Sequence, residues 1–204
     1  MTKIKICGLT KAADIEYVNE LSPDYIGFVF AKSSRRIDID TAKALSSRLS
    51  AQIKPVGVFV NADIPFITKL VFGKTIRLVQ LHGDENESYI SALKKLIEVP
   101  IIKAVRVKNP AEILKAQKLP CDFLLLDTYV ENQIGGSGKA FDHSIIPALE
   151  KPFFLAGGLN PQNVKKAMEI SSPYAVDVSS GVEESGIKSR RLMKEFIDII
   201  REMR

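Results

Sequence analysis

The chain has 204 residues, of which 46% are apolar and 26% are charged. These proportions are typical of a globular protein, and we predict a single domain over residues 1–204. The net charge of +5 comes largely from scattered basic pairs such as Lys94-Lys95 and Arg190-Arg191, with no interleaved aromatic residues. This distribution argues against a nucleic-acid-binding protein.

Only two cysteines occur, Cys7 and Cys121, which is too few for a disulfide framework or a zinc-binding pattern. We see no apolar segment of a signal peptide near the N-terminus and no run of about 18 apolar residues that would span a membrane. We therefore expect a cytoplasmic protein whose thiols stay reduced.

Short apolar runs bounded by turn residues recur along the chain, and these are the predicted strands. Several, such as GFVF and FLLLD, are apolar almost throughout, as in strands of a parallel sheet that is covered on both faces. The runs lie at residues 3–7, 25–30, 55–60, 78–82, 101–107, 123–127, 153–156 and 174–178.

Helical patterns separate these runs. Ile90, Leu93 and Ile97 recur at helical spacing on one face, and Asn160-Pro161 is typical of a capped helix start. A last helical face is predicted at Leu192, Phe196, Ile199 and Met203.

Eight alternating strand and helix units predict an α/β fold, a single-domain (β/α)8 TIM barrel. A doubly wound open sheet is the alternative. It would more naturally carry a G-x-G-x-x-G segment after the first strand, and the sequence has none.

In such barrels the functional residues lie at the C-terminal ends of the strands. Cys7 ends the first predicted strand and His82 ends the fourth, with Gln80 two residues earlier on the same face. Asp127 ends the sixth predicted strand, directly after an apolar run, and Asp177 lies within the eighth strand. A buried unpaired carboxylate is costly, so these acids are candidates for a function, with a structural ion pair or a helix cap as the alternative.

The loops after the seventh and eighth strands are rich in glycine and serine, where barrels of this kind commonly bind phosphate. They read AGGLNP and VSSGVE, so we predict an anion site formed by Gly157, Gly158, Ser179, Ser180 and Gly181, with plain turn chemistry as the alternative.

Two further segments have more than one interpretation. The segment GGSGK within residues 129–141 lacks the spacing of a nucleotide-binding P-loop, and a mobile lid or an ordinary loop remains open. Arg35 and Arg36 follow the second predicted strand, where a guanidinium could bind a carboxylate or simply face solvent.

The segments KICGLT, GFVFAKSSRRI, GVFVN, VQLHGDE, LLLDT, GGSGKAFD, LAGGLNPQNV and AVDVSSGVE resemble the phosphoribosylanthranilate isomerases of tryptophan biosynthesis, in order and spacing, over about residues 3–183. The resemblance implies a catalytic domain that performs an Amadori rearrangement of N-(5-phosphoribosyl)anthranilate to 1-(2-carboxyphenylamino)-1-deoxyribulose 5-phosphate, with neither metal nor coenzyme. It further implies a phosphosugar substrate and a monomer or homodimer, with no nucleic acid or membrane as partner.

The resemblance also implies roles for individual residues. Cys7 of KICG corresponds to the general base of the family and Asp127 of LLLDT to its general acid. Arg35 corresponds to the arginine of its S-x-R-x-I segment, which selects Arg35 over Arg36. The GGLN and SSG segments correspond to those that hold the sugar phosphate, and we assign Gln80, His82 and Asp177 to substrate binding.

This chemistry sets expectations for the two groups. We expect the apolar setting of Asp127 to favour its protonated form. We expect positive surroundings to lower the pKa of Cys7 below its usual range. Two alternatives remain. One is a different phosphosugar barrel enzyme, for instance an aldose–ketose isomerase of histidine biosynthesis that works with Asp127 and Asp177, and the other is a non-catalytic barrel that serves only as a binding or assembly partner.

Overall fold

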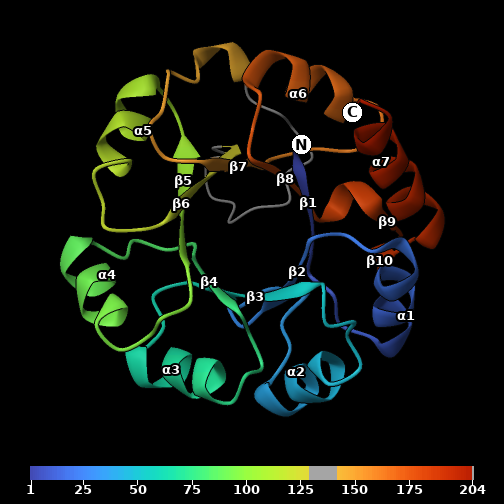
Figure 1. Ribbon diagram of the computed structural model, residues 1–204, viewed down its shortest axis with the longest axis horizontal. Helices are drawn as coiled ribbons and strands as arrows, with labels where there is room; N and C mark the ends of the chain where they lie inside the picture. The colour runs from blue at the N-terminus through green and yellow to red at the C-terminus, as the bar shows by residue number, and fades with distance from the viewer. Residues whose placement is uncertain (129–141, 204) are drawn as a thin grey trace.

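The protein is described by a computed structural model that covers residues 1–128 and 142–203 (Figure 1). Eight parallel strands close into one barrel, because β1 pairs with β2 on one side and with β8 on the other. The predicted (β/α)8 barrel is therefore confirmed. The strands are β1 (Lys3–Cys7), β2 (Tyr25–Val29), β3 (Lys54–Phe59), β4 (Leu78–Leu81), β5 (Ile101–Val107), β6 (Phe123–Thr128), β7 (Phe153–Leu155) and β8 (Ala175–Val178).

Helices form a ring around the strands, and α7 lies beside α1 where the end of the chain meets its beginning (Figure 1). Asp38, Asn86, Asn109 and Ser189 each accept a hydrogen bond from a backbone N–H of the first turn, so side-chain caps start four of them. The helices are α1 (Ala12–Leu21), α2 (Ile39–Ser46), α3 (Ile64–Phe72), α4 (Glu87–Lys94), α5 (Pro110–Ala116), α6 (Val164–Ser171) and α7 (Arg190–Glu202).

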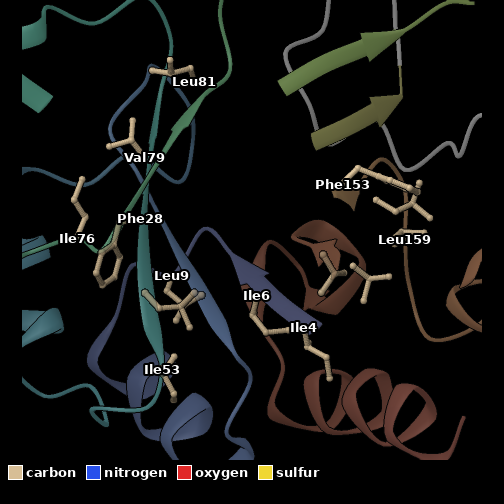
Figure 2. Packing of buried hydrophobic residues seen from close by; sticks show 14 of the residues in the cluster. Ile4, Ile6, Leu9, Phe28, Ile53, Ile76, Val79, Leu81, Phe153 and Leu159 are labelled. Atoms are coloured by element: carbon tan, nitrogen blue, oxygen red, sulfur yellow. The ribbon is translucent and has the colours of Figure 1, made fainter. Parts of the chain in front are cut away.

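The side chains of each strand alternate between two separate cores. Ile4 and Ile6 of β1 join the outer core between strands and helices, together with Phe28 and Val79 (Figure 2). The inner core fills the lower part of the barrel and contains Tyr25, Val56, Leu78, Ile102, Ala104, Leu125, Phe154, Ala156 and Ala175. The side chains of Cys7 and Asp127 also face the inside of the barrel, between this inner core and the C-terminal end of the barrel.

Two local predictions were wrong. Asn160 caps a turn, because its side chain accepts from the N–H groups of Gln162 and Asn163, and α6 begins at Val164, three residues after the predicted start at Pro161. The buried face of α7 is formed by Met193, Phe196, Ile197 and Ile200, so it is rotated from the predicted face, of which only Phe196 is fully buried.

Short elements lie in the connections around the last two strands. The described part of the connection from β6 to β7, residues 142–152, contains a 3₁₀ turn, η1 (His143–Ile145). After β8 come a second 3₁₀ turn, η2 (Ser180–Val182), and a short antiparallel hairpin, β9 (Glu183–Glu184) with β10 (Ile187–Lys188). This hairpin places the charged side chains of Glu183 and Lys188 beside the C-terminal end of the barrel.

None of the helices in the described part of the chain has the length and apolar character needed to span a membrane.

Candidate active site

A cavity at the C-terminal ends of the strands brings together every residue that the sequence singled out for a function. The walls come from strands β1, β2, β3, β4, β6 and β8 and from the loops after β2, β3, β4, β7 and β8. The predicted residues that line it are Cys7, Arg35, Gln80, His82, Asp127, Gly157, Gly158, Asp177, Ser179, Ser180 and Gly181.

Cys7 occupies the last position of β1 and is a buried free thiol. Its neighbour across the β1–β2 pairing is Gly27. A Cβ atom at residue 27 would lie 2.5 Å from the sulfur of Cys7. The glycine therefore makes room for the thiol at the cavity wall.

The electrostatic surroundings of Cys7 contain opposing effects. Burial raises the pKa of the Cys7 thiol above its usual value, and Asp177 adds to that rise, while Lys5 and Lys188 oppose it. The positive surroundings that the sequence analysis expected are present. The expected net lowering is nevertheless wrong, because the loss of hydration outweighs the two ammonium groups.

Lys5 lies two residues before Cys7 on the same face of β1, and sequence reasoning assigned it no function. Its side chain is 0% exposed, and its Nζ donates to Oδ1 of Asp177 at 2.9 Å. Burial opposes the charge of Lys5, but Asp177 and Cys7 outweigh it, so the pKa of Lys5 is raised. The spacing of Lys5 and Cys7 was the signal that both point inward.

Asp127 near the end of β6 is connected to two other predicted residues. Its Oδ1 accepts from the backbone N–H of Thr128 at 2.8 Å, and its Oδ2 is 3.2 Å from Nε2 of His82. Nδ1 of the same histidine is 2.9 Å from Nε2 of Gln80. Gln80, His82 and Asp127 therefore lie in contact with one another along the cavity wall.

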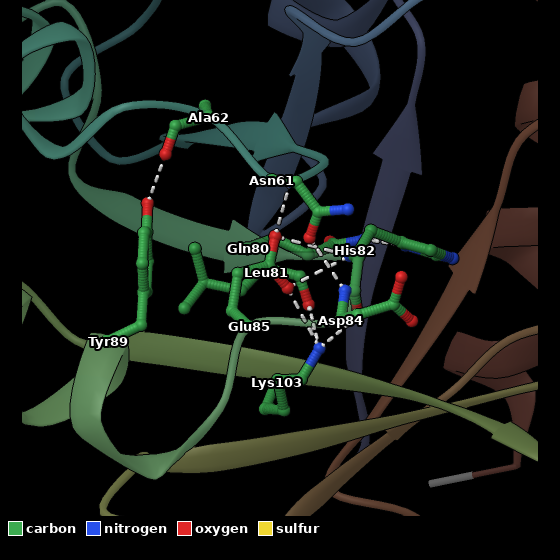
Figure 3. Close-up of polar contacts among 10 residues, drawn as sticks. Asn61, Ala62, Gln80, Leu81, His82, Asp84, Glu85, Tyr89 and Lys103 are labelled. Carbon is green, nitrogen blue, oxygen red and sulfur yellow. Dashed lines mark hydrogen bonds and ion pairs between the residues drawn. The ribbon is translucent and has the colours of Figure 1, made fainter.

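A buried ion pair outside the barrel holds the loop that follows β4 and His82 (Figure 3). Lys103 donates to Oε2 of Glu85 at 2.9 Å and to the carbonyl of Gly83 at 2.6 Å. Glu85 in turn accepts from the backbone N–H groups of Gly83 and Asn61. No sequence pattern indicates this network, because its members come from strand β5 and from the loops after β3 and β4.

The two glycine-rich loops meet backbone to backbone at the cavity. Gly157 and Gly158 have φ of 86° and 67°, in the region that favours glycine. A Cβ at Gly181 would lie 1.9 Å from the carbonyl oxygen of Leu159, so only glycine permits this approach. The N–H groups of Gly158, Ser180 and Gly181 donate no hydrogen bond to any other described residue. Backbone donors left in this way are suited to an anion.

Arg35 and Arg36 point to different places. Arg35 lines the cavity, and its Nε and Nη2 bind the two carboxylate oxygens of Glu183 at 2.7 and 2.6 Å. Lys188 reaches the same carboxylate at 2.6 Å. Arg36 is exposed and does not line the cavity. Sequence reasoning assigned no role to either residue: Glu183 is the last residue of the recognised segment AVDVSSGVE, and Lys188 lies beyond it in the hairpin.

The GGSGK segment belongs to residues 129–141, which lie outside the described residues. The interpretation of this segment as a lid or an ordinary loop therefore stays a prediction.

Comparison with known proteins gives one consistent family. Residues 4–199 match the family model described as N-(5'-phosphoribosyl)anthranilate (PRA) isomerase. The chain is 49% identical to N-(5'-phosphoribosyl)anthranilate isomerase of Lachnoclostridium phytofermentans over 208 residues, covering 96% of this chain and 95% of that protein.

Two solved structures extend this similarity to the fold. A phosphoribosyl anthranilate isomerase from Thermus thermophilus superposes with a TM-score of 0.89 at 30% identity, covering 100% of both chains. A second one, in complex with reduced 1-(o-carboxyphenylamino)-1-deoxyribulose 5-phosphate, has a TM-score of 0.84 at 34% identity and covers 99% of this chain and 100% of its own.

Proposed function

The chain belongs to the N-(5'-phosphoribosyl)anthranilate isomerase family, and within that activity we propose that Cys7 is the general base and Asp127 the general acid. The enzyme converts N-(5'-phosphoribosyl)anthranilate to 1-(2-carboxyphenylamino)-1-deoxyribulose 5-phosphate in tryptophan biosynthesis. The observation that carries the assignment is that Cys7 from β1 and Asp127 from β6 line one cavity, with β7 and β8 between them in the barrel.

In the first step, Asp127 donates a proton to the ring oxygen of the ribose. The bond between C1 and that oxygen breaks, and the nitrogen lone pair forms the C1=N bond of an iminium. His82, 3.2 Å from Oδ2, and the N–H of Thr128 hold the carboxyl group in place. A positioned acid of this kind stabilises the transition state for ring opening.

In the second step, Cys7 removes the proton from C2. The electron pair of the C2–H bond forms a C1=C2 double bond and neutralises the iminium, which gives an enolamine. Tautomerisation then places a proton on C1 and leaves a ketone at C2. The base must be a thiolate to accept the proton, so the reaction depends on the ionisation of Cys7.

The remaining residues are proposed to bind the two ends of the substrate. The N–H groups of Gly158, Ser180 and Gly181 are suited to the phosphate. Arg35 is suited to the anthranilate carboxylate. Since Glu183 already occupies its Nε–Nη2 edge, Arg35 would use the edge formed by Nη1 and Nη2.

The alternative with two catalytic aspartates is less well supported. Asp177 is held by the buried ammonium of Lys5 at 2.9 Å, which favours a structural pair over a free acid or base. We keep it as a cavity-lining residue that limits the space around the substrate.

All eleven proposed site residues belong to one chain and line one cavity. We therefore propose that residues 1–204 form one catalytic domain that needs no residue from a partner, so a monomer or a homodimer would serve equally. A reduced thiol at Cys7 is required for the base, which is consistent with a cytoplasmic enzyme.

The experiment that tests this function follows the anthranilate fluorescence of freshly prepared phosphoribosylanthranilate after the enzyme is added. We expect the signal to fall with saturation kinetics and a 1-deoxyribulose product to accumulate. Phosphosugar binding without any turnover would support the non-catalytic barrel instead.

A side-by-side comparison of Arg35→Ala and Arg36→Ala tests the carboxylate site. We expect kcat/KM to fall about ten- to a hundredfold for Arg35→Ala, because a charge-assisted contact of about 1.5–3 kcal/mol is lost. Arg36 is exposed and its replacement is expected to change little. Equal small losses would remove Arg35 from the substrate site, and a larger loss at Arg36 would assign the contact to that residue.

A further inference from the structure

Lys5 is the one fully buried ammonium inside the described part of the barrel, and the reaction steps above give it no task. Its side chain points inward from β1, one layer below Cys7. Lys5 does not line the substrate cavity. A lysine is almost never fully buried without a reason, because its desolvation is costly.

The ion pair with Asp177 keeps this charge in place. Nζ of Lys5 donates to Oδ1 of Asp177 at 2.9 Å, and the two strands that carry them, β1 and β8, are hydrogen-bonded neighbours in which Lys5 is opposite Asp177. Position and charge of the ammonium are therefore fixed by the sheet itself and not by a mobile loop.

Several charged groups face the thiol of Cys7. Lys5 lies on its own strand, Asp177 on β8 and Lys188 on β10, while Arg35 comes from the loop after β2. On β2 itself the neighbour is Gly27, which carries no charge. Of the two ammonium groups, Lys5 lowers the pKa of Cys7 more than Lys188 does.

The other charges near the site are also paired. Lys188 and Arg35 share the single carboxylate of Glu183. Across the cavity, His82 and Asp127 form their own contact at 3.2 Å. Lys5 is the cation that acts most strongly on Cys7, because it lies two residues away on the same inward face of β1.

We propose that Lys5 is a positioning residue for the isomerisation: with Asp177 as its anchor, it holds a fixed positive charge beside Cys7 and stabilises the thiolate that takes the C2 proton. The proposal rests on Cys7 being the base. It explains how a thiol that is buried among strands can ionise at all, since a nearby cation offsets part of the lost hydration.

The test measures the ionisation of Cys7 directly and does not require turnover. In a Cys121→Ser background, the rate of Cys7 alkylation by iodoacetamide is recorded against pH, because only the thiolate reacts. The variants are Lys5→Met, Lys5→Met with Asp177→Asn, and the matched control Lys3→Met, whose residue is on the same strand but half exposed and paired with Asp24.

We expect the alkylation midpoint of Lys5→Met to move upward by about one to three pH units, the usual effect of losing a close opposite charge. The double variant removes the pair without leaving a lone carboxylate, and we expect a smaller movement in the same direction. Lys3→Met is expected to keep the parental midpoint. At neutral pH, kcat/KM of Lys5→Met would fall about tenfold for each unit of movement, with its rising limb displaced equally.

Unchanged midpoints in both folded Lys5 variants would overturn the proposal, as would an equal movement in Lys3→Met. Circular dichroism identifies any variant that does not fold, and the double variant then carries the test. The outcome is separate from the role of Cys7 as base, which is judged by turnover of Cys7→Ala.

Discussion

Replacement of Cys7 by alanine is expected to lower kcat about 10²–10⁴-fold, the contribution of a positioned acid or base. The cavity lining contains no second group on β1 that could take the C2 proton, since Lys5 lies below the cavity and is tied to Asp177. Ring opening by Asp127 remains possible in the variant. Binding of the reduced product analogue should therefore persist while turnover is lost, as measured by fluorescence kinetics and calorimetry.

The matched control for Cys7→Ala is Cys121→Ser. Cys121 is also a buried free thiol, but it lies just before β6, at the opposite end of the barrel from the cavity. We expect its replacement to leave kcat near the parental value. Parental turnover of Cys7→Ala would make the base assignment wrong and would return the two-aspartate alternative to first place.

Replacement of Asp127 by asparagine is the second change with a large expected effect, again about 10²–10⁴-fold in kcat. Asparagine keeps the shape and can still accept the N–H of Thr128 through Oδ1. It has no acidic proton to give to the ring oxygen, so we expect the reaction to stop before the iminium. The measurement is the fluorescence assay at saturating substrate.

The control is Asp84→Asn, an exposed acid on the loop after β4 that does not line the cavity. We expect nearly parental kcat for this variant. A loss in Asp127→Asn that is confined to KM would show that the carboxylate serves binding, and the role of acid would then have to pass to His82.

Much of the site could be predicted because strand parity and strand ends decide where a side chain points in a barrel. Cys7, Gln80 and Asp127 all follow from an apolar strand whose alternate residues must face inward. The glycine-rich loops could be predicted for a different reason. Gly157 and Gly158 have positive φ angles, a local requirement that the residue type itself indicates.

The parts that were missed depend on pairings between distant segments. Lys5 stands in the alternating run KIKIC, which is equally typical of a strand with one face in water. Only closure of the barrel turns that polar face into a buried one and places Asp177 opposite it. The contact of Glu183 with Arg35 likewise joins residues 148 positions apart.

Helix boundaries were missed for a more local reason. Asn160-Pro161 is a valid capping pattern, but Oδ1 of Asn160 accepts from the N–H groups of a turn, and α6 starts only at Val164. The rotated face of α7 reflects its packing against α1 and α6, which the helical period alone does not fix.

The most direct test of the account compares two pH profiles of the same enzyme, kcat/KM for the isomerisation and the alkylation rate of Cys7. Since kcat/KM reports groups of the free enzyme, both profiles should rise with the same midpoint if the thiolate is the base. Burial raises the pKa of Cys7, so this midpoint should lie above about 8.5, the usual value of a free thiol. With chemistry shown to be rate-limiting, a kcat/KM that stays constant across the range in which Cys7 ionises would contradict the account.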